Sequence, residues 1–167
     1  MKTLLVLRHA KAEQPESGQL DFDRDLTKRG KLDAEKVGQH LAELKLVPQT
    51  IVASAAKRTR KTAQRVAEAL GFGDSEISTT RELYDAGLGD IISVVRQLAS
   101  EADIALIVGH NPGMAEFVSA LGEPLYSYPT ASLACLRLPI DDWQQASTAR
   151  RGELAWIWRP ESEDSGE

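Results

Sequence analysis

The sequence has little cysteine, and this scarcity narrows the class of protein. Cys135 is the only cysteine among 167 residues, so an internal disulfide is excluded. No spacing of cysteine and histidine resembles a zinc site. Such cysteine usage is typical of a reducing compartment, and we expect a cytoplasmic, soluble protein.

Long apolar segments are also missing from the sequence. The chain starts MKTLLVLRHAK, and its first apolar run ends after a few residues at Arg8. This run is too short for the core of a signal peptide or for a membrane span. We therefore expect no membrane partner.

Positive charge is in deficit, since 20 Lys and Arg residues face 25 Asp and Glu residues, for a net charge of -5. This balance argues against nucleic acid as the main partner. With 42% hydrophobic residues, the chain has enough apolar side chains for one core. We expect a single domain over residues 1–159 and a disordered acidic tail over residues 160–167.

Apolar runs alternate with helical patterns along the chain. The runs predict three buried strands, at Leu4–Leu7, Thr50–Ser54 and Ile104–Val108. Apolar residues at spacings of three and four predict helices, which we expect after Thr27, over Lys57–Leu70, over Leu88–Leu98 and from Pro112. Further strands are expected near 76–79 and, closing the chain, at 132–138 and 153–158. The alternation predicts an α/β fold with a mostly parallel central sheet, helices on both faces and an antiparallel edge.

Each of the three buried strands leads into polar residues. The first ends at Arg8 and His9, the second is followed by Arg58, and the third runs into His110. Because parallel strands bring their carboxyl ends to one edge of a sheet, we expect these side chains around one pocket. We expect the two histidine rings to lie about 5 to 7 Å apart, flanking one phosphoryl group. Arginine forks suit phosphate oxygens, and a neutral imidazole is a competent nucleophile. The set indicates phosphoryl chemistry.

Four stretches then carry a resemblance to a known family. They are, in order, LLVLRHAKAE at Leu4–Glu13, LTKRG at Leu26–Gly30, SAAKRTRKTA at Ser54–Ala63 and VGHNPG at Val108–Gly113. In this order they resemble the signatures of the histidine phosphatase superfamily. The short chain and the residues within these motifs make the sequence most similar to the SixA branch of small phosphohistidine phosphatases. The resemblance implies a phosphoglycerate mutase-like, three-layer αβα sandwich.

The resemblance also implies a mechanism and a substrate class. His9 attacks the phosphoryl group, water hydrolyses the resulting phosphohistidine, and Arg8, Arg58 and a protonated His110 neutralise the phosphoryl oxygens. No metal and no cofactor are then expected. The implied partner is phosphohistidine on a signalling protein of the histidine-phosphotransfer type. A phosphatase of small phosphate esters and a non-catalytic phosphate-binding module are the alternatives.

Two positions depart from the pattern of this family. Ala10 stands where the family usually has glycine, and we expect a negative φ there. The short chain has no insertion to carry the usual acidic proton donor. Glu82, in RELYDAG, lies nearest the matching position and is our candidate general acid, with Asp85 close behind. A phosphohistidine substrate makes such an acid dispensable, because the leaving imidazole is protonated beforehand.

Other residues receive structural interpretations. Ser54 either caps the second helix or touches phosphate, and we expect the cap. We expect Asn111 to cap the helix that starts at Pro112, and Thr62 either to hold Arg58 or to pack. A competing class remains for the stretch DRDLT at Asp23–Thr27, which matches the D-x-D-x-T motif of haloacid dehalogenase-like phosphatases. Those enzymes use an aspartate nucleophile and magnesium, but their motif follows a buried strand, which QLDF does not resemble. A mutase would need an enclosing lid, for which the loops are short.

Overall fold

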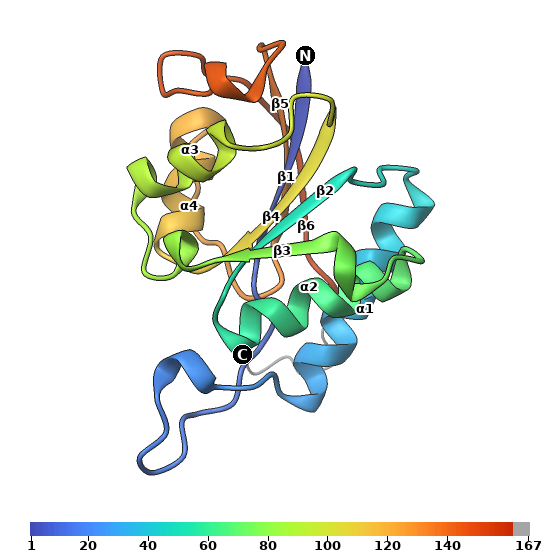
Figure 1. Cartoon of the computed structure of the whole chain (residues 1–167), viewed down its shortest axis with the longest axis vertical. Coiled ribbons are helices and arrows are strands. Elements are labelled where there is room, and N and C mark those ends of the chain that lie inside the picture. Colours follow the sequence, from blue (N-terminus) through green and yellow to red (C-terminus); the bar gives the residue numbers. More distant parts are fainter. Residues whose placement is uncertain (162–167) are drawn as a thin grey trace.

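A six-stranded sheet, with helices on both of its faces, forms the centre of the molecule (Figure 1). The computed structural model describes residues 1–161. Residues 162–167, which hold most of the expected acidic tail, lie outside the described residues, and the expected domain boundary at 159 stays a prediction. The strands are β1 (Lys2–Arg8), β2 (Thr50–Ser54), β3 (Ile77–Thr80), β4 (Ile104–Gly109), β5 (Leu133–Leu138) and β6 (Glu153–Trp158). The α-helices are α1 (Lys28–Glu43), α2 (Lys57–Ala69), α3 (Leu88–Arg96) and α4 (Gly113–Leu121).

The order of the strands confirms the expected mostly parallel sheet. The order is β3-β2-β4-β1-β5-β6, and the first four of these strands are parallel to one another. β5 pairs antiparallel with β1, and β6 pairs antiparallel with β5, which gives the expected antiparallel edge. In the register of β1 and β4, Arg8 lies opposite Gly109, so both strands end at the same level.

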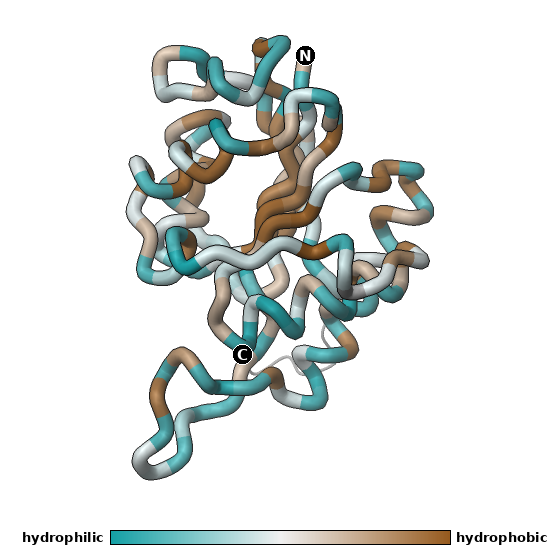
Figure 2. The backbone as a smooth tube through the Cα atoms, viewed as in Figure 1, coloured by the Kyte–Doolittle hydropathy of each residue, from teal (hydrophilic) through white to brown (hydrophobic). Residues whose placement is uncertain are grey.

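The alternation of side chains along β1 divides the core into two layers. Leu4 and Val6 pack with residues of α3 and α4, whereas Leu5 and Leu7 pack with residues of α1 and α2. All four leucine and valine side chains are fully buried. Figure 2, coloured by hydropathy, shows the central strands as a brown, hydrophobic band. A strand covered on both faces needs an unbroken apolar run, which accounts for the sequence of β1.

The start of α1 holds the chain that leaves β1. Thr27 caps the helix by accepting a hydrogen bond from the Gly30 amide (2.9 Å), and its own amide donates to the Lys11 carbonyl (3.0 Å). A Cβ at Gly30 would lie 2.2 Å from the same Lys11 carbonyl oxygen. The motif LTKRG therefore brings a helix and an extended segment into contact at a distance that only glycine allows.

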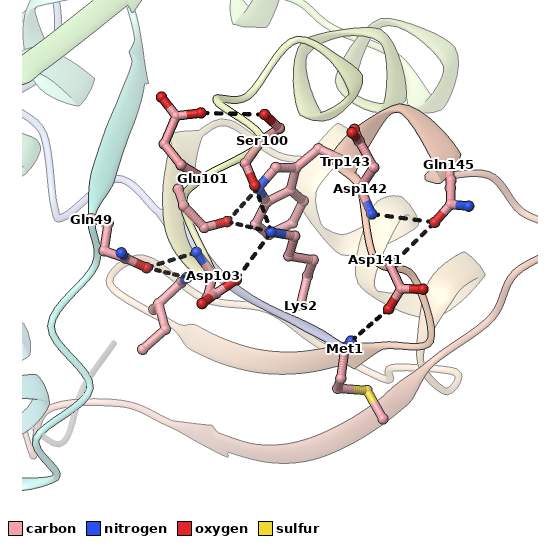
Figure 3. A network of polar contacts seen from close by, with 12 residues as sticks. Met1, Lys2, Gln49, Ser100, Glu101, Asp103, Asp141, Asp142, Trp143 and Gln145 are labelled. Carbon is pink, nitrogen blue, oxygen red and sulfur yellow. Dashed lines mark hydrogen bonds and ion pairs between the residues drawn. The ribbon is translucent and has the colours of Figure 1, made fainter.

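A polar network closes the opposite end of β1 (Figure 3). The ammonium of Lys2, 3% exposed, donates to the carbonyls of Ser100 and Ala102 and pairs with the carboxylate of Asp103 at 3.1 Å. The indole of Trp143 donates to the Ala102 carbonyl as well. A buried ammonium needs such acceptors to offset its desolvation. The polar groups of Lys2 and Trp143 at this end of β1 are therefore used in structural contacts.

We expect Gly30→Ala to destabilise the protein by about 1 to 3 kcal/mol, because the added methyl group overpacks the contact with Lys11. Urea unfolding measures the loss. Gly89→Ala is the matched control, since a Cβ at Gly89, within α3, meets nothing within 4 Å. That substitution should be neutral or stabilising, because alanine favours helix. Equal effects of the two changes would contradict our account of LTKRG.

Candidate active site

The four residues expected to converge do lie together at the carboxyl edge of the parallel strands. Arg8 and His9 at the end of β1, Arg58 in the first turn of α2 and His110 after β4 line one cavity of about 470 Å³. The ring centroids of His9 and His110 are 5.3 Å apart, within the expected range. The sheet therefore assembles two imidazoles and two guanidinium groups from segments far apart in the sequence.

The hydrogen bonds of His9 fix its tautomer. Nδ1 lies 2.7 Å from the carbonyl oxygen of Ala10, and a carbonyl oxygen only accepts, so Nδ1 carries the proton. Burial lowers the pKa of His9 to about 3. The bond to Ala10 opposes this shift, whereas the charges of His110, Arg58 and Arg8 add to it. At pH 7 the ring is neutral, and Nε2 holds a lone pair available for attack.

The charge of His110 follows from its surroundings. Burial and then the nearby Arg58 lower its pKa to about 4, although Asp21 acts in the opposite direction. The ring is therefore neutral at pH 7, because burial beside two arginines disfavours another cation. The protonated form was expected with a phosphoryl group bound, and it stays a prediction for that complex. A phosphoryl dianion between the rings would raise the pKa again.

Ser54 holds His110 and does not cap a helix. Its hydroxyl lies 2.8 Å from Nε2 of His110, whereas the N-cap of α2 is Ala56, without a side-chain capping bond. The predicted capping role is wrong because β2 ends directly beside β4, where the buried hydroxyl meets the imidazole. Nδ1 of His110, also buried, has no hydrogen-bond partner among the described residues. That atom is the ring nitrogen left for a ligand.

Asp21, which the sequence analysis did not single out, positions Arg58. The guanidinium of Arg58 donates to the backbone carbonyl (2.8 Å) and to the carboxylate (3.0 Å) of Asp21. Tyr84 and Arg24 donate to the same carboxylate at 2.8 and 3.0 Å. Burial opposes ionisation of this carboxyl, but these hydrogen bonds outweigh it and hold the pKa of Asp21 well below its usual range. Aspartates occupy every second position from Asp21 to Asp25, and no sequence pattern distinguishes Asp21 from the other two.

Thr62 links α2 to the backbone that follows His9. Its hydroxyl donates to the Arg58 carbonyl (2.7 Å) and accepts from the Ala10 amide (3.1 Å). The expected negative φ at Ala10 is confirmed, because Ala10 is not among the non-glycine residues with positive φ, which are Lys45, Asp85 and Ala131. The methyl group of Ala10 is fully buried against Leu26 and its neighbours. Alanine in place of the family's glycine therefore fits without backbone strain.

Tyr128 is a second residue that the sequence analysis missed. Its carbonyl accepts from Arg8 (3.2 Å) and from the side chain of Asn111 (2.7 Å), and its hydroxyl donates to the Val6 carbonyl. Asn111 was expected to cap α4, and this expectation is wrong, because its amide is used by Tyr128 and the N-cap is Pro112. A lone tyrosine in an irregular segment gives no signal of such a role.

The structure does not bring Glu82 to the two histidines. Glu82 is exposed, accepts a hydrogen bond from Gln97 at 3.4 Å and lines a separate cavity between α3 and the β2–β3 edge. Asp85 instead lines a cavity of about 300 Å³ that also contacts His110. Of the two carboxylates considered for the general acid, only Asp85 shares a cavity with either histidine.

The D-x-D-x-T interpretation is wrong for this fold. Asp23 lies in a 3-10 turn, Asp21–Asp23, between β1 and α1, and Asp25 pairs with Lys57 at 3.4 Å. No buried strand leads directly into these residues, because β1 ends at Arg8 and a loop lies between. Among residues 1–161, no group of three His, Cys, Asp or Glu side chains is placed to hold a metal ion. No helix in the same range has the length and apolar character to cross a membrane.

The fold and this constellation define a class, that of α/β proteins with a paired-histidine, paired-arginine phosphoryl site. The family model of the histidine phosphatase superfamily (branch 1) matches residues 4–123, and the chain belongs to this superfamily.

Relatives and solved structures agree with this assignment. The chain is 31% identical, over 153 residues, to an uncharacterised chloroplast protein of Arabidopsis thaliana, a match that covers 87% of this chain and 70% of that protein. It is 29% identical over 111 residues to the 2,3-bisphosphoglycerate-dependent phosphoglycerate mutase of Bartonella tribocorum, covering 63% of this chain and 54% of the mutase. A structure from Agrobacterium tumefaciens assigned as a SixA phosphohistidine phosphatase shares 29% identity and a TM-score of 0.79, covering 95% and 99% of the two chains. These matches support the SixA-type branch.

We expect the protein to lose stability as the pH falls from 7 to 5. The pKa values of His9 and His110, about 3 and 4 in the folded state, lie below the ordinary value of 6.5. The unfolded chain then binds more protons than the folded one, and the free energy of unfolding falls by about 2 kcal/mol for each histidine. Urea unfolding at both pH values measures the loss. A double variant, His9→Asn with His110→Asn, should show a clearly smaller pH dependence, and an equal one would contradict the assignment.

Proposed function

We propose that the protein is a metal-independent phosphatase that acts through a phosphohistidine intermediate on His9. The observation that carries the proposal is the hydrogen bond from Nδ1 to the Ala10 carbonyl, which leaves the Nε2 lone pair of a neutral ring in a cavity with two arginines. Neutral imidazole beside fixed positive charge is the arrangement that nucleophilic attack on a phosphoryl dianion requires.

In the first step, Nε2 of His9 attacks phosphorus and the bond from phosphorus to the leaving group breaks. The leaving group departs with the bonding electron pair. A leaving imidazole keeps the proton that it already carries, and an ester oxygen takes its proton from solvent water. Arg8 and Arg58 neutralise the phosphoryl oxygens, and Nδ1 of His110, which has no partner among the described residues, donates once the dianion has raised its pKa. In the second step, the oxygen of water bonds to phosphorus and the bond from phosphorus to Nε2 breaks. Its electrons return to Nε2, and the protons of water leave with the inorganic phosphate.

The preferred substrate in this proposal is phosphohistidine on a signalling protein. Similarity to the A. tumefaciens structure supports it. The position of Glu82, remote from the histidines, supports it as well, because a leaving imidazole that is already protonated needs no dedicated acid. Hydrolysis of small phosphate esters by the same mechanism is the second candidate, favoured by a cavity large enough for a small molecule.

A cytoplasmic location is part of the proposal, supported by the single, buried Cys135.

Brief incubation with a labelled phosphodonor in excess EDTA, followed by an alkaline quench, should leave label on the chain. A phosphoramidate on imidazole survives alkali, whereas an acyl phosphate on aspartate does not. His9→Ala should abolish both label and turnover. His40→Ala is the matched control and should retain both, because His40 stacks on Trp158 (3.9 Å) away from the cavity.

Other outcomes of this experiment would overturn the mechanism. Activity lost in EDTA and restored by magnesium would show that a metal supplies the charge. Stoichiometric phosphate binding without label or turnover, across many donors, would establish a binding module.

We expect Arg58→Ala to lower the rate about a hundredfold or more, the usual cost of losing one group that stabilises the transition state. Glu82→Gln should change turnover of a phosphohistidine peptide by less than about twofold, since its side chain faces another cavity. Steady-state kinetics on that peptide compares both. A large loss in Glu82→Gln would return Glu82 to the candidate acids, and an unchanged rate in Arg58→Ala would remove Arg58 from the site.

A further inference from the structure

The cavity that holds the two histidines extends beyond the groups that a phosphoryl needs. Its volume of about 470 Å³ falls in the range that accommodates whole small ligands, about 300 to 1,000 Å³. Two further arginines, Arg24 and Arg159, line it, and none of its lining residues is an aspartate or a glutamate. Positive charge is thus concentrated here in a chain with a net charge of -5.

Both additional arginines are held in place by the backbone. Nε of Arg24 donates to the Glu13 carbonyl (2.7 Å), and Nε of Arg159 donates to the Thr130 carbonyl (2.9 Å). These two bonds engage the inner nitrogens and leave outer guanidinium nitrogens for other partners. An arginine whose fork is already oriented loses less conformational entropy when it binds an anion.

The two arginines differ in how far their charge is already neutralised. Arg24 forms an ion pair with Asp21 at 3.0 Å through one outer nitrogen. Arg159 forms no ion pair with any residue in the range 1–161. Burial lowers the pKa of Arg8, and the charge of Arg159 is the next cause, ahead of Arg58. Arg159 and Arg8 therefore repel each other, and an anion close to both would relieve that repulsion.

We propose that Arg24 and Arg159 form a second anion-binding subsite, which holds an acidic group of the substrate next to the phosphoryl group. The inference rests on the proposed function, because it places the phosphoryl on Arg8, Arg58 and the two histidines. The ligand chemistry is a carboxylate or phosphate in addition to the phosphoryl that is hydrolysed. Such a group can come from a small ester with a second acid function or from an acidic side chain beside a phosphohistidine.

The test compares substrates that differ only in the second charge. The first pair is 3-carboxyphenyl phosphate and its methyl ester. The second pair is a phosphohistidine peptide with glutamate beside the phosphohistidine and the same peptide with glutamine. We expect kcat/KM of the acidic member to exceed that of the neutral member at least about tenfold in one pair or both, as for a hydrogen bond between charged groups.

Variants assign this preference to the arginines. Arg159→Gln and, independently, Arg24→Gln should reduce the ratio of the two kcat/KM values toward one. Arg159→Glu should reverse the preference when 3-(aminomethyl)phenyl phosphate replaces the acidic ester. Arg65→Gln is the matched control, because it also replaces an arginine by glutamine, but at a residue of α2 that does not line this cavity. It should keep the wild-type ratio.

The rates within the two substrate pairs identify the source of the second acidic group. A preference in the ester pair identifies a small acidic ester as the source, and a preference in the peptide pair identifies an acidic side chain. Equal rates within both pairs, or a preference that persists in both glutamine variants, overturns the subsite and leaves the phosphatase proposal standing. No turnover of any of these substrates overturns the proposed function itself.

Discussion

One hydrogen bond sets the chemistry of this site, the bond from Nδ1 of His9 to the carbonyl of its neighbour Ala10. Without it the neutral ring could carry its proton on either nitrogen, and the lone pair would not be fixed on Nε2. The surrounding contacts keep the Ala10 peptide in place. Thr62 binds its amide from α2, and the motif LTKRG holds the Lys11 carbonyl one residue further on. Family motifs that lie apart in the sequence thus hold the same short backbone segment, from His9 to Lys11.

Electrostatics gives the arginines a double effect. Burial is the main reason that both histidines resist protonation, and the charges of Arg58 and Arg8 add to it, so the proposed nucleophile His9 stays neutral well below pH 6.5. The same charges attract a phosphoryl dianion, and its arrival reverses the balance at His110. Asp21 fixes the direction of the Arg58 fork through two hydrogen bonds. Loss of Asp21 would therefore alter both the geometry and the charge of the site.

The sequence predicted the strands and the four converging residues because their signals are local. An apolar run predicts a strand, and the polar residues that follow it, Arg8 and His9 or His110, mark the carboxyl edge of the sheet. Asp21, Tyr128 and Ser54 escaped prediction because their roles depend on which distant segment lies beside them. Arg8 and the Tyr128 carbonyl that it contacts are 120 positions apart in the sequence, and backbone carbonyls carry no sequence signal. The lowered pKa of His110 escaped prediction for the same reason, since burial is a property of the assembled core.

The position of β1 in the sheet has a consequence for biosynthesis. β1 is the first strand of the chain, yet its neighbours are β4 and β5, so Thr3 pairs with Ile104 on one side and Arg137 on the other. At about 5 to 20 residues per second, a ribosome completes these partners many seconds after it has made β1. Throughout that interval an apolar strand with two unpaired edges is exposed, the kind of segment that aggregates or recruits chaperones. β1, which leads into His9, is thus made before both of its sheet neighbours and cannot pair with either until they have been made.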